Sequence, residues 1–154
     1  MQRGASEIAD RPDDSTERSS GPGTLEEIRS GGVTLAYIVR ADYAPATTVF
    51  VTPEQTQLQA GFVSISQGAA IPRHNHKRVE RAVQGTAEAL LVRRGTCTVD
   101  FYDDRRELTA SRDLAVGDLV LLVSGGHGFR AIEDTLLLEI KQGPYLGPDD
   151  KERF

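Results

Sequence analysis

The chain has 154 residues, of which 38% are hydrophobic and 27% are charged. This length and balance suit one globular domain that buries a core without disulfides. A formal net charge of -5 argues against a protein that binds nucleic acid through general electrostatic attraction. Cys97 is the one cysteine, so it has no partner for an internal disulfide, which fits a reducing compartment.

The N-terminal region has the composition of an unstructured segment. The first ten residues lack the apolar middle of a secretory signal, and no apolar run approaches the roughly 18 residues of a membrane-spanning helix. Residues 10–23 contain no large apolar side chain, so burial cannot offset the entropy lost on ordering them. We therefore predict a disordered tail over 1–23, a single domain over 24–154, a cytoplasmic location and no membrane contact.

The domain is predicted to begin with a short helix and to continue as strands. Thr24 and Glu27 have the spacing of a capping box, and Gly31-Gly32 would end a helix after one or two turns. The following segments are rich in β-branched and aromatic residues and are separated by turn residues. The predicted strands cover residues 33–39, 47–51, 58–66, 87–92, 96–102, 119–123 and 135–141. Many short strands at regular spacing predict an all-β antiparallel sandwich or barrel.

Alternation within these strands predicts which side chains face the core. Cys97, Val99 and Phe101 alternate with polar residues, so we expect Cys97 to be a core residue and not a reactive thiol. Glu139 is flanked by apolar residues in the strand 135–141. The sequence leaves open whether Glu139 faces away from the core or toward a functional site.

The three histidines of the chain all lie at expected strand edges or tight turns. Alternate side chains of a strand share a face, so His74 and His76 would point the same way and could grip one metal ion. Such a site needs further ligands. Glu88 begins an apolar strand, and His127 lies in a glycine-rich turn after the strand 119–123. Imidazoles with one carboxylate suit Fe, Mn, Ni, Cu or Zn and leave coordination positions open.

Two segments resemble the sequence motifs of the cupin superfamily. The first has a glycine, a His-x-His pair, a glutamate and a second glycine, and the second has a Gly-Asp pair, an apolar strand and a glycine-flanked histidine. The matching residues are Gly68, His74, His76, Glu88, Gly95, Gly117, Asp118, Gly125, Gly126 and His127. The resemblance implies a double-stranded β-helix, or jelly-roll barrel, that holds one divalent transition metal. By the same resemblance its ligands are His74, His76, Glu88 and His127.

The carboxylate ligand has two candidates. The gap from His76 to Glu88 is several residues longer than the common cupin spacing, and Glu80 lies at the common distance. Glu88 precedes an apolar strand and stands at the motif distance from the second glycine, whereas Glu80 lies in a charged segment. We therefore favour Glu88, with Glu80 as the alternative. If Glu88 is correct, Leu90 and Val92 share its face and continue the barrel lining.

Two shorter likenesses suggest a biological setting. Residues 138–145, with Asp149-Asp150-Lys151, are similar to the end of the WbuC-type cupin-fold metalloproteins found among bacterial surface-polysaccharide genes. Residues 73–77 resemble the basic two-histidine strand of the FdtA- and WxcM-type nucleotide-sugar keto-isomerases, which are cupins that work without metal. The resemblance also implies a homodimer, which would protect open sheet edges such as the strand 33–39.

Basic and aromatic residues near the motifs are candidates for substrate binding. The basic ones could clamp a phosphate or a sugar acid, or they could form a solvated loop. The aromatic ones could stack on a sugar ring or simply pack in the core. The candidates are Arg73, Lys77, Arg78, Arg81, Tyr102, Phe129 and Tyr145.

Three classes of function are compatible with these residues. The first is a metal-dependent cupin enzyme, an oxidoreductase or isomerase, that acts on a small anionic or carbohydrate-derived molecule. The second is a metal-free nucleotide-sugar keto-isomerase in which His74 or His76 moves a proton next to a ketone. The third is a non-catalytic module that binds a small ligand. Metal content of the purified protein separates the first class from the second.

Overall fold

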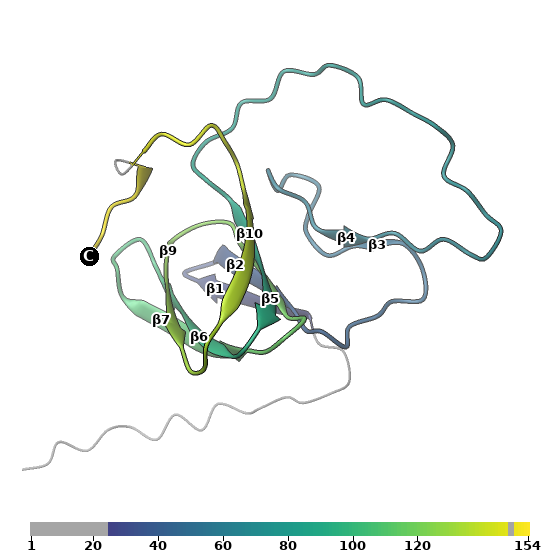
Figure 1. Ribbon diagram of the computed structural model, residues 1–154. Helices are drawn as coiled ribbons and strands as arrows, with labels where there is room; N and C mark the ends of the chain where they lie inside the picture. The colour runs from purple at the N-terminus through teal and green to yellow at the C-terminus, as the bar shows by residue number, and fades with distance from the viewer. Residues whose placement is uncertain (1–24, 148–149) are drawn as a thin grey trace, which may run out of the picture.

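The computed structural model describes residues 25–147 and 150–154, and these residues form β-strands and no α-helix (Figure 1). The antiparallel all-β architecture predicted from the strand pattern is therefore confirmed. The five-stranded sheet has the order β1 (Leu25–Ser30), β2 (Val33–Val39), β8 (Leu119–Leu122), β5 (Glu88–Arg94) and β10 (Leu136–Lys141). The three-stranded sheet has the order β7 (Leu108–Leu114), β6 (Cys97–Tyr102) and β9 (Gly126–Ala131). The predicted tail, residues 1–23, lies outside the described residues.

The prediction of a short N-terminal helix was wrong for the described part of that segment, because these residues form strand β1. Every residue of β1 is paired with β2, and Ile28 is 4% exposed in the core. Gly31 and Gly32 do not end a helix but form the tight turn between the two strands, with φ of +54° and +85°. Positive φ at both turn positions matches the twist of a two-residue hairpin. Pairing with β2 and burial of Ile28 therefore outweigh the local capping pattern.

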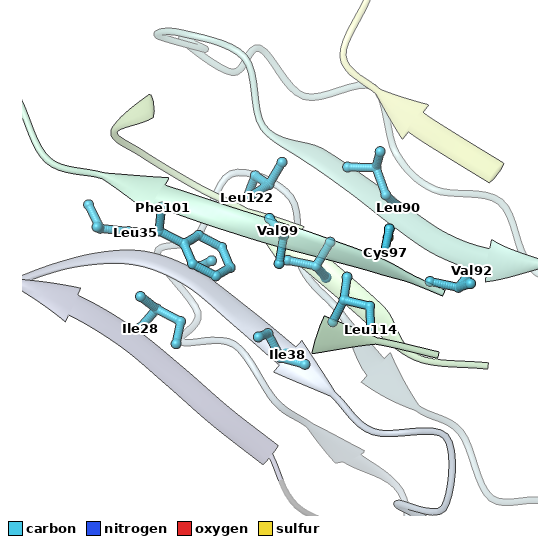
Figure 2. Close-up of a cluster of buried hydrophobic side chains, with 12 residues drawn as sticks. Ile28, Leu35, Ile38, Leu90, Val92, Cys97, Val99, Phe101, Leu114 and Leu122 are labelled. Carbon is cyan, nitrogen blue, oxygen red and sulfur yellow. The ribbon is translucent and has the colours of Figure 1, made fainter. Parts of the chain in front are cut away.

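The two main sheets face each other across a shared hydrophobic core (Figure 2). Cys97, Val99 and Phe101 are each at most 1% exposed, which confirms both the predicted inward set of β6 and the core position of the cysteine. Leu90 and Val92 of β5 are also buried, as predicted for the face they share with Glu88. The remaining members of the core cluster are Ile28, Leu35, Ala36, Ile38, Leu114, Val120 and Leu122.

The predicted strands differ from the observed strands mainly between β2 and β5. The segments 47–51 and 58–66 shrink to the two-residue strands β3 (Val49–Phe50) and β4 (Gly61–Phe62), which pair only with each other. Residues 63–87 contain no strand, and the segment 40–87 runs out from the two main sheets as a long excursion (Figure 1). No ladder of backbone hydrogen bonds therefore holds the residues that carry His74 and His76.

The expectation that the strand 33–39 is an open sheet edge was also wrong. β2 lies between β1 and β8 and pairs with both. The outer strands of the two main sheets are instead β1, β10, β7 and β9. The sheets are not joined along β9 and β10, so this side of the molecule is open.

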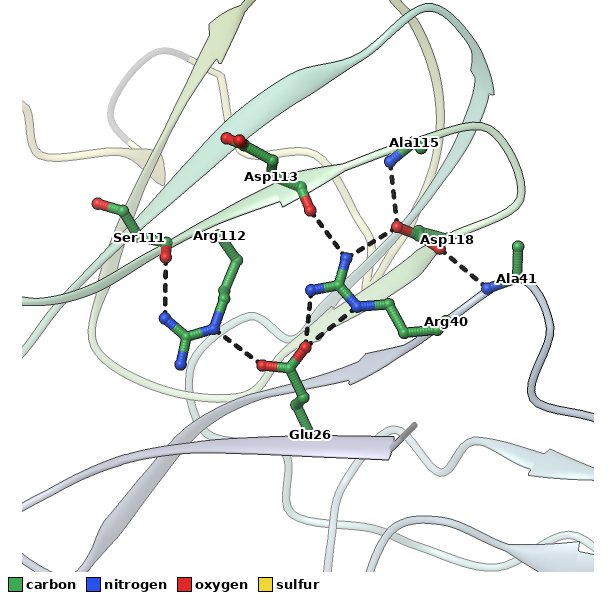
Figure 3. Close-up of polar contacts among 8 residues, drawn as sticks. All are labelled: Glu26, Arg40, Ala41, Ser111, Arg112, Asp113, Ala115 and Asp118. Carbon is green, nitrogen blue, oxygen red and sulfur yellow. Dashed lines mark hydrogen bonds and ion pairs between the residues drawn. The ribbon is translucent and has the colours of Figure 1, made fainter. Parts of the chain in front are cut away.

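One end of the two sheets is fastened by a charged network around Arg40 (Figure 3). Its guanidinium donates to the Glu26 carboxylate at 2.7 Å and to Asp118 at 2.9 Å, and Arg112 donates to the second oxygen of Glu26 at 2.8 Å. Asp118 also accepts hydrogen bonds from the backbone of Ala41 and Ala115. The network thus ties β1, β2 and β7 to the turn before β8.

Candidate functional site

Glu88 and His127 meet at the end of the sheets opposite the Arg40 network. Glu88 is the first residue of β5, and His127 is the second residue of β9. The Nε2 atom of His127 lies 3.2 Å from the Oε2 atom of Glu88. The contact joins the five-stranded sheet to the three-stranded sheet, so it exists only because the two sheets pack face to face.

Strand register explains why both side chains point inward. His127 lies opposite Phe101 in the ladder between β9 and β6, and residues opposite each other in an antiparallel pair share a face. Phe101 is in the core, so His127 faces the same interior. Glu88 is on the inward face of β5 with Leu90 and is 5% exposed. A carboxylate this buried requires a polar partner, and His127 supplies one.

Charged neighbours and burial set the state of the imidazole. Burial lowers the pKa of His127 below its ordinary value and outweighs the opposing attraction of the Glu88 carboxylate. The Lys151 ammonium lowers the pKa of His127 further, and Glu139 raises it. The neutral imidazole is therefore favoured, which is the form that binds metal ions or accepts a proton.

Strand register also shows on which face of its strand Glu139 lies, which the sequence alone leaves open. Glu139 lies opposite Leu90 in the ladder between β10 and β5, so it is on the face that carries Glu88. Its side chain is exposed, and its negative charge raises the pKa of His127 from a distance. Glu139 therefore belongs to the surroundings of the Glu88 and His127 pair.

The other two predicted ligands lie elsewhere. His74 and His76 are exposed on the excursion, with ring centroids 5.4 Å apart, and the His74 ring contacts the carbonyl oxygen of Pro72 at 2.8 Å. Among the described residues, no group of three or more His, Cys, Asp or Glu side chains could hold a metal ion. The structure thus forms two separate pairs, and the four-ligand metal site stays a prediction.

The remaining candidate residues divide between the excursion and the sheets. Glu80 is exposed on the excursion, as are the basic residues Arg73, Lys77, Arg78 and Arg81. Phe129 packs against the core, with its ring 6.0 Å from that of His127. Tyr102 is half-buried at the end of β6, and Tyr145 is 68% exposed beside Lys141.

Sequence reasoning missed one charged neighbour of the site. The Nζ atom of Lys151 lies 4.0 Å from the Oε1 atom of Glu88. No local pattern around Lys151 indicates that the end of the chain returns to the start of β5. Its contact depends on the path of the chain after β10.

A cavity of about 650 Å³ lies beside the start of β5 and the turn before β9, where its lining includes Ala87 and Gly125. The rest of its lining comes from β2 and the excursion and includes Tyr37, Gln55 and Gln84, but none of the four predicted metal ligands. Comparison with family models, curated proteins and solved structures found no match to the chain. The chemistry of the Glu88 and His127 pair is therefore inferred from its own residues. Among the described residues, no helix has the length and apolar character needed to cross a membrane.

Proposed function

We propose that this chain is a small cupin-type metal-binding protein and an enzyme that acts on a small anionic or carbohydrate-derived molecule. The observation that carries the proposal is the 3.2 Å contact between His127 and Glu88. The two sequence motifs predict both residues as ligands of one metal ion, although residues 89–126 separate them in the sequence. Their meeting inside the fold is what a shared metal site requires.

The strand pairing supports a jelly-roll arrangement. β5 pairs with β10, and within that pair β6 pairs with β9, so the ladders are nested. The chain crosses between the two sheets after β5, β7, β8 and β9. A long hairpin rolled over on itself produces this nesting, which is the topology of a double-sheet jelly roll. The open side at β9 and β10 would then be the place for two further strands.

The excursion has the composition to fill that open side. The five large apolar side chains of its strandless part, residues 63–87, are 49% to 59% exposed, and exposure of apolar surface to water is unfavourable. They are Val63, Ile65, Ile71, Val79 and Val83. If residues 63–77 pair with the free edges of β9 and β10, then Val63, Ile65 and Ile71 become covered, and His74 and His76 approach the Glu88 and His127 pair.

The donor set fits a divalent transition metal. Glu88 offers one buried carboxylate and His127 a ring whose neutral form is favoured, and His74 and His76 would add two imidazoles. When bound, such an ion supplies a Lewis acid with an open position for substrate or water. The chain itself would bind and orient an anionic substrate through the basic residues that flank the histidines. Those residues are Arg73, Lys77, Arg78 and Arg81.

Elemental analysis of protein purified without added metal tests the proposal. We expect near-stoichiometric metal in the wild type and loss of metal in His74→Ala, His127→Ala and Glu88→Gln. Glu80→Gln is the matched control and should keep its metal. Retention by Glu88→Gln with loss in Glu80→Gln would move the carboxylate ligand to Glu80. Metal-free wild-type protein that stays metal-free in the presence of each candidate ion would contradict the proposal.

The His127 and Glu88 contact also favours a second candidate function. An imidazole within hydrogen-bonding distance of a carboxylate is a general acid–base arrangement that needs no metal. In that case the protein would resemble the metal-free isomerases in mechanism, and turnover would survive dialysis against a strong chelator. Loss of turnover on chelation, with recovery on adding back metal, would exclude this candidate.

We also propose that the protein forms a homodimer through β10. β10 is an outer strand, and Leu136, Leu138 and Ile140 on its outward face are 47% to 57% exposed. These side chains form an apolar patch on the outward face of the sheet, and a second copy packed on that face would cover the patch while leaving the edge of β10 free. Light scattering of the wild type should give twice the monomer mass, and Ile140→Lys should give the monomer mass. A monomeric wild type at high protein concentration would contradict this proposal.

A further inference from the structure

The cavity of about 650 Å³ lies on the outer face of the five-stranded sheet. Its lining includes Tyr37 of β2, and the residues on either side of Tyr37, Ala36 and Ile38, belong to the core cluster. Because successive side chains of a strand point to opposite faces, Tyr37 points away from the core. Glu88 lies opposite the core residue Leu122 and is therefore on the inner face of the same sheet. The cavity and the Glu88 carboxylate are thus on opposite faces of the sheet.

Two segments of the excursion form the other wall of the cavity. Residues 55–57 lie between β3 and β4, and residues 84–86 lead into β5. The outer face of the sheet is covered here, since Tyr37 is 6% exposed and Leu121, which lies opposite it in the ladder between β2 and β8, is 1% exposed. The cavity therefore lies between β2 and the excursion, and a molecule bound in it would contact both.

The Tyr37 hydroxyl has no protein partner. Among the described residues it takes part in no hydrogen bond, and no fully buried side-chain nitrogen or oxygen lacks a partner. The hydroxyl is therefore not sealed inside the protein, and the small exposed part of this side chain includes it. Because Tyr37 lines the cavity, its hydroxyl opens into the cavity. The rest of the side chain is buried, so this group is held in place and is free to bond to a ligand.

The lining is polar but uncharged. None of the described residues that line the cavity is acidic or basic. The side-chain amides of Gln55, Gln57 and Gln84 make no hydrogen bond within the part of the chain that the structure describes. Each amide has two donors and an acceptor, and the Tyr37 hydroxyl can donate and accept. A charged ligand would lose hydration here without meeting an opposite charge. The lining therefore suits a neutral ligand that carries several hydroxyl groups.

We propose that this cavity is a second binding site, separate from the Glu88 and His127 pair, and that it takes a neutral sugar. Every sugar hydroxyl can donate and accept a hydrogen bond, which matches the glutamine amides and the Tyr37 hydroxyl. The volume of about 650 Å³ is within the range of roughly 300–1,000 Å³ for small-molecule sites. A bound sugar also holds the excursion against β2. The site does not depend on the proposed metal-binding function.

Isothermal titration calorimetry with neutral sugars tests the proposal. The probes are glucose, galactose, mannose, maltose and lactose, and the charged counterparts of the three hexoses are glucuronate, galacturonate and mannuronate. We expect at least one neutral sugar to bind and the uronates to bind about tenfold more weakly than the hexoses of the same ring, because the lining has no cation. No binding of any of the five neutral sugars at millimolar concentration would overturn the proposal. Uronates that bind as tightly as hexoses would overturn it as well.

Tyr37→Phe tests whether the sugar lies in this cavity. The variant removes only the hydroxyl and should weaken sugar binding by about three- to tenfold, the contribution of one hydrogen bond. Its thermal unfolding should match the wild type, because the hydroxyl has no protein partner. Tyr43→Phe is the matched control, since Tyr43 packs against Phe62 outside the cavity lining and should keep the wild-type affinity. Equal affinity in the two variants would show that the sugar binds elsewhere.

Gln84→Leu and Gln67→Leu form a second pair of variants. Both glutamines are exposed on the excursion, but only Gln84 lines the cavity, so only Gln84→Leu should lose affinity, again by about three- to tenfold. An equal loss in Gln67→Leu would contradict the placement of the sugar.

Titration in excess EDTA separates this site from the proposed metal site. The sugar affinity should be the same with and without the chelator. Loss of sugar binding on chelation would place the sugar at the metal and overturn the second site. Unchanged sugar binding by a protein that takes up no metal would remove the proposed metal function and leave the sugar site standing.

Discussion

Replacing Arg40 by Met should destabilise the fold because it breaks the charged network at the start of β8. The Arg40 guanidinium donates four hydrogen bonds, two to Glu26, one to Asp118 and one to the carbonyl oxygen of Asp113. The side chains of Asp118 and Glu26 are 8% and 27% exposed, so water replaces the lost partner only in part. Removing one member of a fully buried ion pair costs about 3–5 kcal/mol.

The expected loss for Arg40→Met is smaller than that limit. Glu26 keeps its hydrogen bond from Arg112, and Asp118 keeps the backbone donors of Ala41 and Ala115. We therefore expect a loss of about 2 kcal/mol in the free energy of unfolding. For a chain of this length, that corresponds to a fall in Tm of about 4–8 °C.

The loss should also depend on pH. Burial raises the pKa of Glu26, but hydrogen bonds from Arg112 and Arg40 outweigh it, so the pKa lies below its ordinary value of 4.5. A carboxyl group with a lowered pKa in the folded state stabilises the fold above its unfolded pKa, and this contribution is lost as pH falls through the folded pKa. The difference between wild type and Arg40→Met should therefore be largest above about pH 5 and shrink in acid.

Urea unfolding at neutral and acidic pH measures this difference. Arg29→Met is the control, because Arg29 is 51% exposed and pairs with Glu27 at the surface of the same sheet. That variant should lose at most about 0.5 kcal/mol. If Arg40→Met unfolds at the same urea concentration as Arg29→Met, or if its deficit grows in acid, the reasoning about the network is wrong.

Three further outcomes follow from the core and the turns. Phe101→Ala should lower the free energy of unfolding by about 3–5 kcal/mol, because it leaves a cavity between the two sheets, and calorimetry would detect this. Gly95→Ala should be strongly destabilising in the same measurement, since Gly95 has φ of +73° and a Cβ atom would lie 2.4 Å from the carbonyl oxygen of Asp134. The Cys97 thiol should react with a thiol reagent only in denaturant, because it is 1% exposed and burial raises its pKa. Fast reaction in native buffer would contradict its core position.

The face on which each side chain lies could be predicted from the sequence for the long strands. Alternation placed Cys97, Val99 and Phe101 in the core and put Glu88 on the same face as Leu90, and the structure has them so. This works because the side-chain period of a strand depends on local geometry and not on what the strand pairs with. The same local patterns predict a turn at Gly126-His127-Gly128, but these residues pair with β6 and form part of strand β9.

The sequence by itself determined the all-β class, the inward faces of β5 and β6, and which residues are candidates for a metal site. Only the tertiary structure decided that β1 is a strand, that Glu88 lies against His127, and that Lys151 returns to the same place. The reason is that alternation along a single strand sets the face on which each of its side chains lies. A contact between sheets depends on register, loop path and burial summed over the whole chain.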